Sequence, residues 1–287
     1  AAEMHQPDRA PALSPPSDPV RGSGLRIGLV HQRYVSFGGA ERYMDALVTG
    51  LLERGHEVHV FAHRWDPRAG ERGVVLHRVP MLPGASWLKL PSFAWNCARA
   101  VAGAGCDAVL SLERTWRQDV YRAAGGCHRA WLAQRARYAT AWRRLGAWLN
   151  PLHPVLLWME GRTFSPRRTR GIIALSHQGR SEIRQHYPQA PAQIEVIHLG
   201  VDLDRYRPSG TRRPGDPFIL LFVGTGWERK GLEFAIRALA RLPGRVRLRV
   251  YGKGRVGRYR RLARQLGCDS RLEFRGVASD MPRVYAE

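Results

Sequence analysis

The chain has 287 residues, 44% of them hydrophobic and 24% charged, a composition that fits one and a half to two globular α/β domains and excludes a disordered chain. No apolar stretch reaches the roughly 18 residues that a membrane-spanning helix requires. The net charge of +22 comes mainly from dispersed arginines, which leaves nucleic acid, an anionic membrane and a merely solvated surface as open explanations.

The first predicted elements form a βαβ unit behind an N-terminal tail. Residues 1–24 are rich in Pro, Ser and Asp and contain no apolar segment of the kind a signal peptide has, so we predict a disordered tail there. An apolar strand follows at 25–31, then a helix at 40–54 and a strand at 56–62. This unit is the repeating element of parallel sheets.

Strands and helices continue to alternate along the rest of the chain. We predict further strands at 73–79, 107–112, 120–124, 171–175, 194–198, 218–223, 245–251 and 272–274. We predict further helices at 87–104, at 129–149, in a segment ending near 164, and at 178–187, 231–242 and 257–266. The alternation predicts an α/β fold with parallel sheets.

A change in composition suggests where one domain ends. Pro, Gly and charged residues gather at 209–217, which predicts a linker between an N-terminal domain at 25–208 and a C-terminal domain at 218–287. The second domain has only three predicted strands with their crossover helices, half of a doubly wound sheet, and its last strand would have an unpaired edge. We therefore expect this domain to be truncated at its C-terminus.

The loop from Gly224 to Gly231 gives the strongest chemical signal. It joins an apolar strand to a helix, a turn at which backbone N–H groups can face an anion. Arg229 and Lys230 add two cationic donors, each worth roughly 1.5–3 kcal/mol against a charged acceptor. Because cations at a helix N-terminus oppose the helix dipole, a diphosphate ligand explains them better than simple solvation does.

Two glycine motifs allow more than one interpretation. Gly38 and Gly39 lie at the first strand-to-helix turn, where they either let a ligand approach the backbone or merely form a tight turn. The G-x-G-x-x-G pattern at 252–257, with Glu273 about twenty residues on, is also found in dinucleotide-binding folds and suggests an NAD dehydrogenase. A complete βα unit precedes it here, however, whereas that fingerprint normally opens its domain.

Metal and disulfide chemistry have little support in the sequence. Asp202 and Asp204 lie just after a predicted strand, with no third carboxylate near them. The four cysteines show neither a metal-ligand spacing nor a disulfide framework, which favours a reducing cytoplasm. We expect no metal site.

The predicted helix at 129–149 has aromatic residues along one face and arginines on much of the remainder. This composition is typical of an interfacial helix on an anionic bilayer. The same tryptophans could instead pack on their own domain, and both interpretations stay open.

Five segments in order carry a family resemblance across residues 25–287. They are Gly38–Arg42, Glu53–Val58, Gln118–Arg122 with Gly125–His128, Ile197–Asp202 and Glu228–Gly231. Together they resemble family four of the GT-B glycosyltransferases, and within it the enzymes that add glucose or a similar hexose to the lipopolysaccharide core.

The resemblance implies two Rossmann-like domains, with the donor nucleotide held mainly by the second and the acceptor by the first. It implies metal-independent transfer with retention at the anomeric carbon. Arg229 and Lys230 would neutralise the departing diphosphate, and the Gly38–Gly39 turn would bind the same phosphates, Gly39 through its backbone N–H.

The resemblance also implies catalytic residues in the first domain. His128 would reach the donor sugar, and Glu113 and Asp119 are candidate acceptor-site carboxylates. Two departures stand out: many relatives have an acidic residue where this chain has Gly125–Gly126, and the family's pair of donor-binding glutamates should lie beyond Glu287.

The sequence therefore predicts a retaining hexosyltransferase that uses a nucleotide sugar, with UDP-glucose the first candidate, and a lipopolysaccharide-core or other lipid-linked acceptor. We expect no separate cofactor, no nucleic-acid partner, and a peripheral place on the cytoplasmic face of a bacterial inner membrane. The alternative is a non-catalytic protein that binds an anionic glycolipid or membrane surface.

Overall fold

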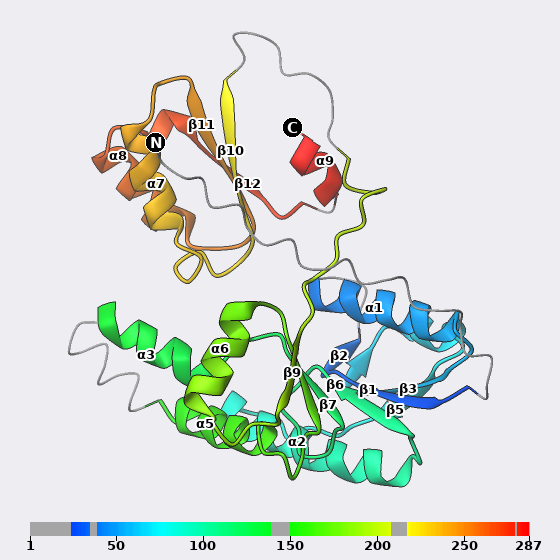
Figure 1. Cartoon of the computed structure of the whole chain (residues 1–287). Coiled ribbons are helices and arrows are strands. Elements are labelled where there is room, and N and C mark those ends of the chain that lie inside the picture. Colours follow the sequence, from blue (N-terminus) through cyan, green and yellow to red (C-terminus); the bar gives the residue numbers. More distant parts are fainter. Residues whose placement is uncertain (1–23, 35–38, 139–149, 208–216, 279, 287) are drawn as a thin grey trace, which may run out of the picture. The chain divides into compact units, whose positions relative to one another are not determined.

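The computed structural model describes residues 24–34, 39–138, 150–207, 217–278 and 280–286. The chain divides into two compact units, residues 1–199 and 200–287 (Figure 1). Each unit has its own parallel sheet and is described by itself.

The first unit is built on a seven-stranded parallel sheet with the order β5-β3-β1-β6-β7-β8-β9. The strands are β1 Arg26–Val30, β3 Glu57–Ala62, β5 Val75–Arg78, β6 Ala108–Ser111, β7 Val120–Ala123, β8 Gly171–Ala174 and β9 Gln193–Val196. β6 and β8 are short apolar runs because helices cover both faces of the sheet. Strand order reverses between β1 and β6, which makes this the topological switch point, where open α/β sheets bind ligands.

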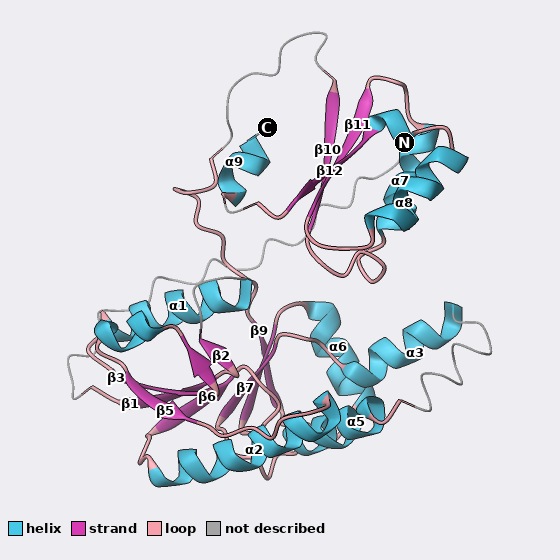
Figure 2. Cartoon of the chain, turned by 180° about the vertical axis from the view of Figure 1, so that it is seen from behind, coloured by secondary structure: helices cyan, strands magenta, loops and turns pink. Residues whose placement is uncertain are grey.

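Helices lie on both faces of this sheet (Figures 1 and 2). They are α1 Gly39–Leu52, α2 Ser86–Gly103, α3 His128–Tyr138, α5 Leu152–Thr163 and α6 His177–His186. Neighbouring strand residues point to opposite cores: Leu29 packs with Met44 of α1. Val30 packs with Phe93 of α2.

A small separate sheet in the first unit pairs β2 (Arg33–Tyr34) with β4 (Arg64–Trp65), and the 3-10 helix η1 (Pro67–Arg72) follows. The sequence pattern did not predict these elements. Two residues are too few to show an alternating pattern.

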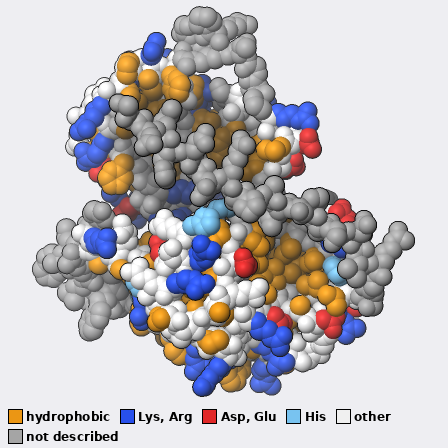
Figure 3. All heavy atoms as spheres, viewed as in Figure 1, with side chains coloured by type: hydrophobic (Ala, Val, Ile, Leu, Met, Phe, Trp, Pro, Cys, Tyr) orange, Lys and Arg blue, Asp and Glu red, His pale blue; other side chains and the backbone are white. Residues whose placement is uncertain are grey.

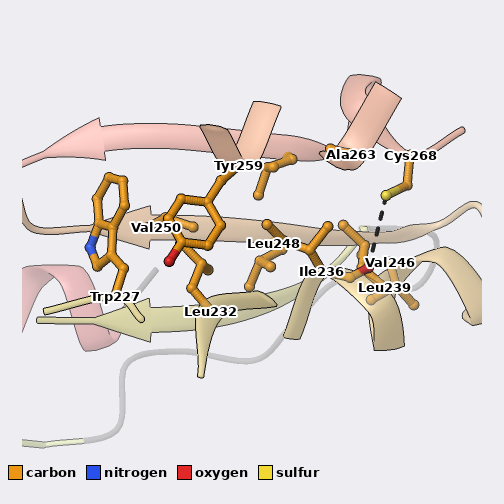
Figure 4. Packing of buried hydrophobic residues seen from close by; sticks show 11 residues of the cluster. Trp227, Leu232, Ile236, Leu239, Val246, Leu248, Val250, Tyr259, Ala263 and Cys268 are labelled. Atoms are coloured by element: carbon orange, nitrogen blue, oxygen red, sulfur yellow. Dashed lines mark hydrogen bonds between the residues drawn. The ribbon is translucent and has the colours of Figure 1, made fainter. Parts of the chain in front are cut away.

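The second unit has three parallel strands in the order β10-β11-β12. Its elements are β10 Phe218–Val223, α7 Leu232–Arg241, β11 Val246–Tyr251, α8 Val256–Gln265, η2 Asp269–Arg271, β12 Leu272–Gly276 and α9 Met281–Ala286. Both α7 and α8 contribute to a single core, in which Leu248 and Val250 of β11 pack against Ile236 and Tyr259 (Figure 4). Arg247 and Arg249 alternate with these apolar residues along β11, so its other face is polar.

The predicted α/β fold with two Rossmann-like parallel sheets is confirmed, and most of the predicted strands and helices end within a few residues of those observed. The helix predicted at 129–149 is described only as α3, since 139–149 lies outside the described residues. The linker predicted at 209–217 also lies almost wholly outside them, so the domain boundaries stay a prediction. None of the described helices has both the length and the hydropathy needed to cross a membrane.

Candidate functional site

The switch point of the first sheet brings three polar residues together. His31 and Gln32 follow β1, and Glu113 follows β6. Glu113 Oε1 lies 2.9 Å from His31 Nδ1, and it accepts the backbone N–H of Gln32 at 3.3 Å. The predicted residue Glu113 therefore lies at the crevice that the topology favours, beside two residues that the sequence pattern did not single out.

A buried arginine lies in the next strand. Arg122 of β7 is 3% exposed, and its guanidinium carbon is 3.8 Å from the ring centroid of Tyr43 on α1. Its Nε has no hydrogen-bond partner among the described residues. Burial lowers the pKa of Arg122. The side chain is thus a buried positive charge whose main compensation comes from Tyr43.

His128 follows β7 and begins α3. Its Nε2 lies 3.2 Å from Nδ1 of His153 on α5, and its ring stacks on Trp131 with the centroids 5.4 Å apart. Burial lowers the pKa of both histidines. Two neutral rings can share this contact with one donor and one acceptor, so His153 and Trp131 together fix the orientation of His128.

Glu160 of α5 holds the first turn of α3 although it is 0% exposed. Its carboxylate accepts the backbone N–H groups of His128 at 2.7 Å and Arg129 at 3.1 Å, two amides that a helix N-terminus leaves free. It also accepts from Arg114 at 3.1 Å and from the Tyr187 hydroxyl at 2.8 Å. Glu160 therefore positions His128 from 32 residues away in the chain.

Asp119 lies at the opposite edge of the sheet. It precedes β7, and its Oδ2 accepts the backbone N–H of Val109 at 2.9 Å, while Arg170 Nε lies 3.6 Å from Oδ1. In a parallel sheet the amino ends of all strands share one edge and the carboxyl ends share the other. The structure does not bring Asp119 together with Glu113 and His128, and we do not retain it as a site residue.

The first glycine turn is described only in part. Gly38 lies outside the described residues, and Gly39 is the first residue of α1. The backbone N–H of Gly39 thus lies at a helix N-terminus, which suits the predicted phosphate contact. That contact stays a prediction.

In the second unit, the loop between β10 and α7 is a tight turn. Gly224 and Gly231 have positive φ angles of 131° and 80°, which glycine adopts without strain. The indole of buried Trp227 donates to the Gly224 carbonyl at 2.9 Å. Lys230 Nζ donates to the Val223 carbonyl at 3.1 Å, and Arg229 is exposed. Both predicted phosphate-binding cations follow the carboxyl end of β10 closely.

Close packing explains the first two glycines of the G-x-G-x-x-G pattern at 252–257. A Cβ on Gly254 would lie 2.2 Å from the Trp227 ring, and a Cβ on Gly252 would lie 2.1 Å from the Gly224 carbonyl oxygen. Glu273, the expected ribose ligand, already accepts from Arg249 at 3.2 Å. The NAD interpretation therefore has no support, because these glycines let the neighbouring loop pack closely.

The remaining predictions concern metal and membrane. Asp202 Oδ1 accepts the backbone N–H groups of Asp204 and Arg205 at 3.0 and 3.1 Å, and the described part of the chain contains no group of three potential ligands. On α3, Trp131 is 38% exposed and packs against the two histidines. Residues 139–149 lie outside the described ranges, so both interpretations of the 129–149 helix stay open.

Each of the two α/β units thus has a parallel sheet with polar groups beyond the carboxyl ends of its strands. Comparison with known families then shows to which family the chain belongs. The sequence matches Glycosyltransferase Family 4 over residues 37–205 and Glycosyl transferases group 1 over residues 217–287. The first match spans more than half of the chain, and the chain belongs to glycosyltransferase family 4.

Similar proteins agree with this assignment. The lipopolysaccharide glucosyltransferase WaaG of Escherichia coli is 25% identical over 88% of this chain and 70% of its own length. Glycogen synthase of Mycobacterium tuberculosis is 28% identical over 80% of this chain and 62% of its own length. The chain thus spans about two thirds of the length of these relatives.

Solved structures show the fold. The crystal structure of WaaG matches with a TM-score of 0.71 and 22% identity, covering 90% of this chain and 72% of that one. Anabaena HepE in complex with UDP and glucose matches with a TM-score of 0.58 and 16% identity, covering 91% of this chain and 71% of that one. The fold is that of the GT-B glycosyltransferases.

Proposed function

We propose that this chain serves the transfer of a hexose from a nucleotide sugar, UDP-glucose being the first candidate, to a lipopolysaccharide-core or other lipid-linked glycan. The loop Gly224–Gly231 carries the proposal, because it presents Arg229 and Lys230 beyond the carboxyl end of β10 in a family 4 chain. Similarity to WaaG supports glucose and lipopolysaccharide, and the HepE complex with UDP and glucose supports the nucleotide.

The chemistry proposed for the loop is stabilisation of the leaving diphosphate. Negative charge grows on that group as the glycosidic bond to the donor breaks, and fixed cations placed beside it lower the barrier without a metal ion. Lys230 Nζ gives one of its three N–H donors to the Val223 carbonyl, which anchors the side chain and leaves two donors for phosphate oxygens. Arg229 adds a planar fork that can bind two oxygens at once.

In the first unit, we assign to His128 the contact with the donor sugar and to Glu113 a contact with the acceptor. The lowered pKa of His128, caused mainly by burial, keeps the imidazole neutral, so that it can hydrogen-bond a sugar hydroxyl without an ionic charge. Glu160 and His153 position the ring. Retention at the anomeric carbon belongs to the same proposal and rests on the family resemblance.

A lipid-linked acceptor requires the protein to work at a membrane surface. We place it peripherally on the cytoplasmic face of a bacterial inner membrane, where its net charge of +22 is attracted by anionic lipids. A non-catalytic glycolipid-binding protein is the competing function. Nucleotide-sugar binding separates the two.

Calorimetric titration with UDP and UDP-glucose tests the proposal. Replacing Arg229 and Lys230 together by Ala should weaken nucleotide binding more than about tenfold, because two charge-assisted hydrogen bonds are lost. Arg241 and Arg245 provide the matched control: both are exposed in the same unit, at the end of α7 and just before β11. Their double replacement by Ala removes the same charge and should leave binding unchanged.

Two outcomes count against the transferase. If the chain binds neither UDP nor UDP-glucose while it binds glycolipid vesicles, the binding function replaces it. If both double variants lose affinity equally, the effect comes from net charge, and the phosphate-binding role of Arg229 and Lys230 is wrong.

A further inference from the structure

Three tryptophans form a cluster on the first unit, and two of them are exposed. Trp95 comes from α2, Trp158 from α5, and Trp116 from the segment between β6 and β7. Trp95 is 58% exposed and Trp158 is 45% exposed. Large aromatic side chains gathered on a surface in this way usually mark an interaction site.

The rings pack edge to face and are flanked by arginines. The ring centroids of Trp95 and Trp116 are 6.0 Å apart, and those of Trp116 and Trp158 are 5.3 Å apart. The Arg162 guanidinium carbon lies 4.7 Å from the Trp158 ring centroid, and Arg168 Nη1 donates to the Trp116 carbonyl at 3.0 Å. We call these five residues the Trp–Arg surface.

The helices that carry this surface expose no acidic side chain. The α2 sequence contains no Asp or Glu. The only acidic residue of α5, Glu160, is 0% exposed. Exposed Leu88 and Arg99 on α2 lie seven residues before and four residues after Trp95, spacings that place them on its helix face. On the face of this unit seen in Figure 3, blue and orange side chains lie beside a few red ones.

Charge and ring geometry restrict the occupant. A second copy of this chain would bring the same uncompensated arginines to the contact, and like charges face to face are costly. Single-stranded nucleic acid stacks its bases on free aromatic faces. Here the three rings pack against one another and Arg162 lies over Trp158, which leaves less free ring face for bases.

We propose that the Trp–Arg surface binds an anionic lipid bilayer at the level of the headgroups. Tryptophan prefers this depth because its ring is apolar and its N–H is polar. Arginines beside the rings pair with lipid phosphates, which adds electrostatic attraction to the insertion of the rings.

This inference rests on the proposed function in one respect: a lipid-linked acceptor is the reason to expect a bilayer near the protein. It names α2 and α5 as the docking elements, which differ from the predicted interfacial helix at 129–149. Vesicle binding needs no nucleotide. The two proposals can therefore fail separately.

Flotation with vesicles of phosphatidylglycerol and phosphatidylethanolamine at about 0.15 M salt, compared with phosphatidylcholine alone, measures the interaction. Replacing Trp95 and Trp158 by Ala should lower partitioning to anionic vesicles roughly tenfold. Replacing Arg162 by Gln should lower it about fivefold. The matched control is Phe234→Ala on α7, an aromatic that is 75% exposed in the second unit, and it should change nothing.

The replacements Trp142→Ala and Trp148→Ala, made together, test the 129–149 segment in the same assay. Loss of vesicle binding in that variant, with full binding when Trp95 and Trp158 are replaced, overturns the proposal. The proposal is also overturned if the wild-type protein does not bind vesicles but dimerises or binds a single-stranded RNA oligonucleotide. Trp95→Phe with Trp158→Phe keeps most of the packed volume, so a fall in partitioning of this variant with unchanged circular dichroism supports the proposal even if the Ala variant unfolds.

Discussion

The sites at the carboxyl ends of the two sheets are built in different ways. In the second unit one continuous segment, Gly224–Gly231, supplies both cations, and backbone geometry and Trp227 hold it in shape. In the first unit, the side chains come from several distant segments. Glu113, His128 and Glu160 follow or belong to different elements. His128 and Glu160 come together only after the chain has folded, as Glu113 does with His31.

This difference has consequences for mutation. A continuous loop depends on the local packing around its own turn. It is therefore most sensitive to mutation at neighbouring residues where a larger side chain has no room. A discontinuous site depends on tertiary hydrogen bonds, so one buried residue far from the reacting groups can control it. Variants in each unit therefore test whether the two sites respond to mutation in these different ways.

The largest effect is expected at Glu160. Replacing Glu160 by Ala leaves the Arg114 guanidinium buried without its carboxylate partner, 19% of its side chain being exposed, and it removes the acceptor for the first turn of α3. Breaking a buried pair costs about 3–5 kcal/mol. Denaturant unfolding followed by circular dichroism measures the change.

Glu182 on α6 is the matched control for Glu160. Its carboxylate accepts a hydrogen bond from the side chain of Gln178, four residues earlier on the same exposed helix face, so Glu182→Ala should cost less than about 0.5 kcal/mol. Equal losses in the two variants would show that Glu160 is no more important than a surface carboxylate, and the contrast between the units would disappear.

The next effect is expected at Gly254 in the second unit. An Ala Cβ there would lie 2.2 Å from the buried Trp227 ring, and overpacking of this kind costs about 1–3 kcal/mol. Gly257 in the same motif has open space around it, since an added Cβ would meet no atom within 4 Å. It lies in α8, where Ala is the better helix former by up to about 1 kcal/mol.

Thermal unfolding of the two Gly→Ala variants compares them directly. Gly254→Ala should lower the midpoint and Gly257→Ala should hold or raise it. The reverse order would mean that the pattern at 252–257 is not explained by packing against Trp227.

The sequence was sufficient for most of the fold. Apolar runs and helical spacing located the strands of both sheets and the helices between them, because each is long enough to show its period. Strands β2 and β4 have two residues each and show none. The order of the seven strands required three-dimensional information, since periodicity does not say which strands are neighbours.

The site was predictable only where it is continuous or follows directly from strand ends. Arg229 and Lys230 stand beside each other in one loop. Asp119 could have been set aside from the sequence, because it precedes the predicted strand at 120–124 and so had to lie at the amino edge. Glu160 also has a signal in the sequence: it is the only acidic residue between positions 120 and 181, in a stretch rich in arginine. The sequence does not predict its contacts with His128, because they depend on how α3 and α5 pack.

A smaller effect is expected at Arg122. Burial opposes its charge, and Arg122→Met removes that charge at similar length, so the free energy of unfolding should rise by about 1 kcal/mol. Tyr43→Leu, which removes the ring 3.8 Å from the guanidinium, should instead destabilise the fold by up to about 2 kcal/mol. A lower stability of Arg122→Met would contradict this view.

The smallest effect is the pH dependence of the His128–His153 pair. Burial lowers the pKa of both rings, so the unfolded state binds more protons as the pH falls below about 6.5. The stabilisation is therefore complete above that pH and is lost as the pH falls through the folded-state values. NMR titration of histidine side chains follows each ring.

Two variants should move the pKa of His128 in opposite directions. Glu160 raises that pKa, whereas Arg114 and His153 lower it. Glu160→Gln should therefore lower the pKa of His128 further, and His153→Asn should raise it toward the ordinary value. A shift of the same sign in both variants would mean that the fold responds as a whole, and that the distant carboxylate does not act on His128 through the contacts of the first unit.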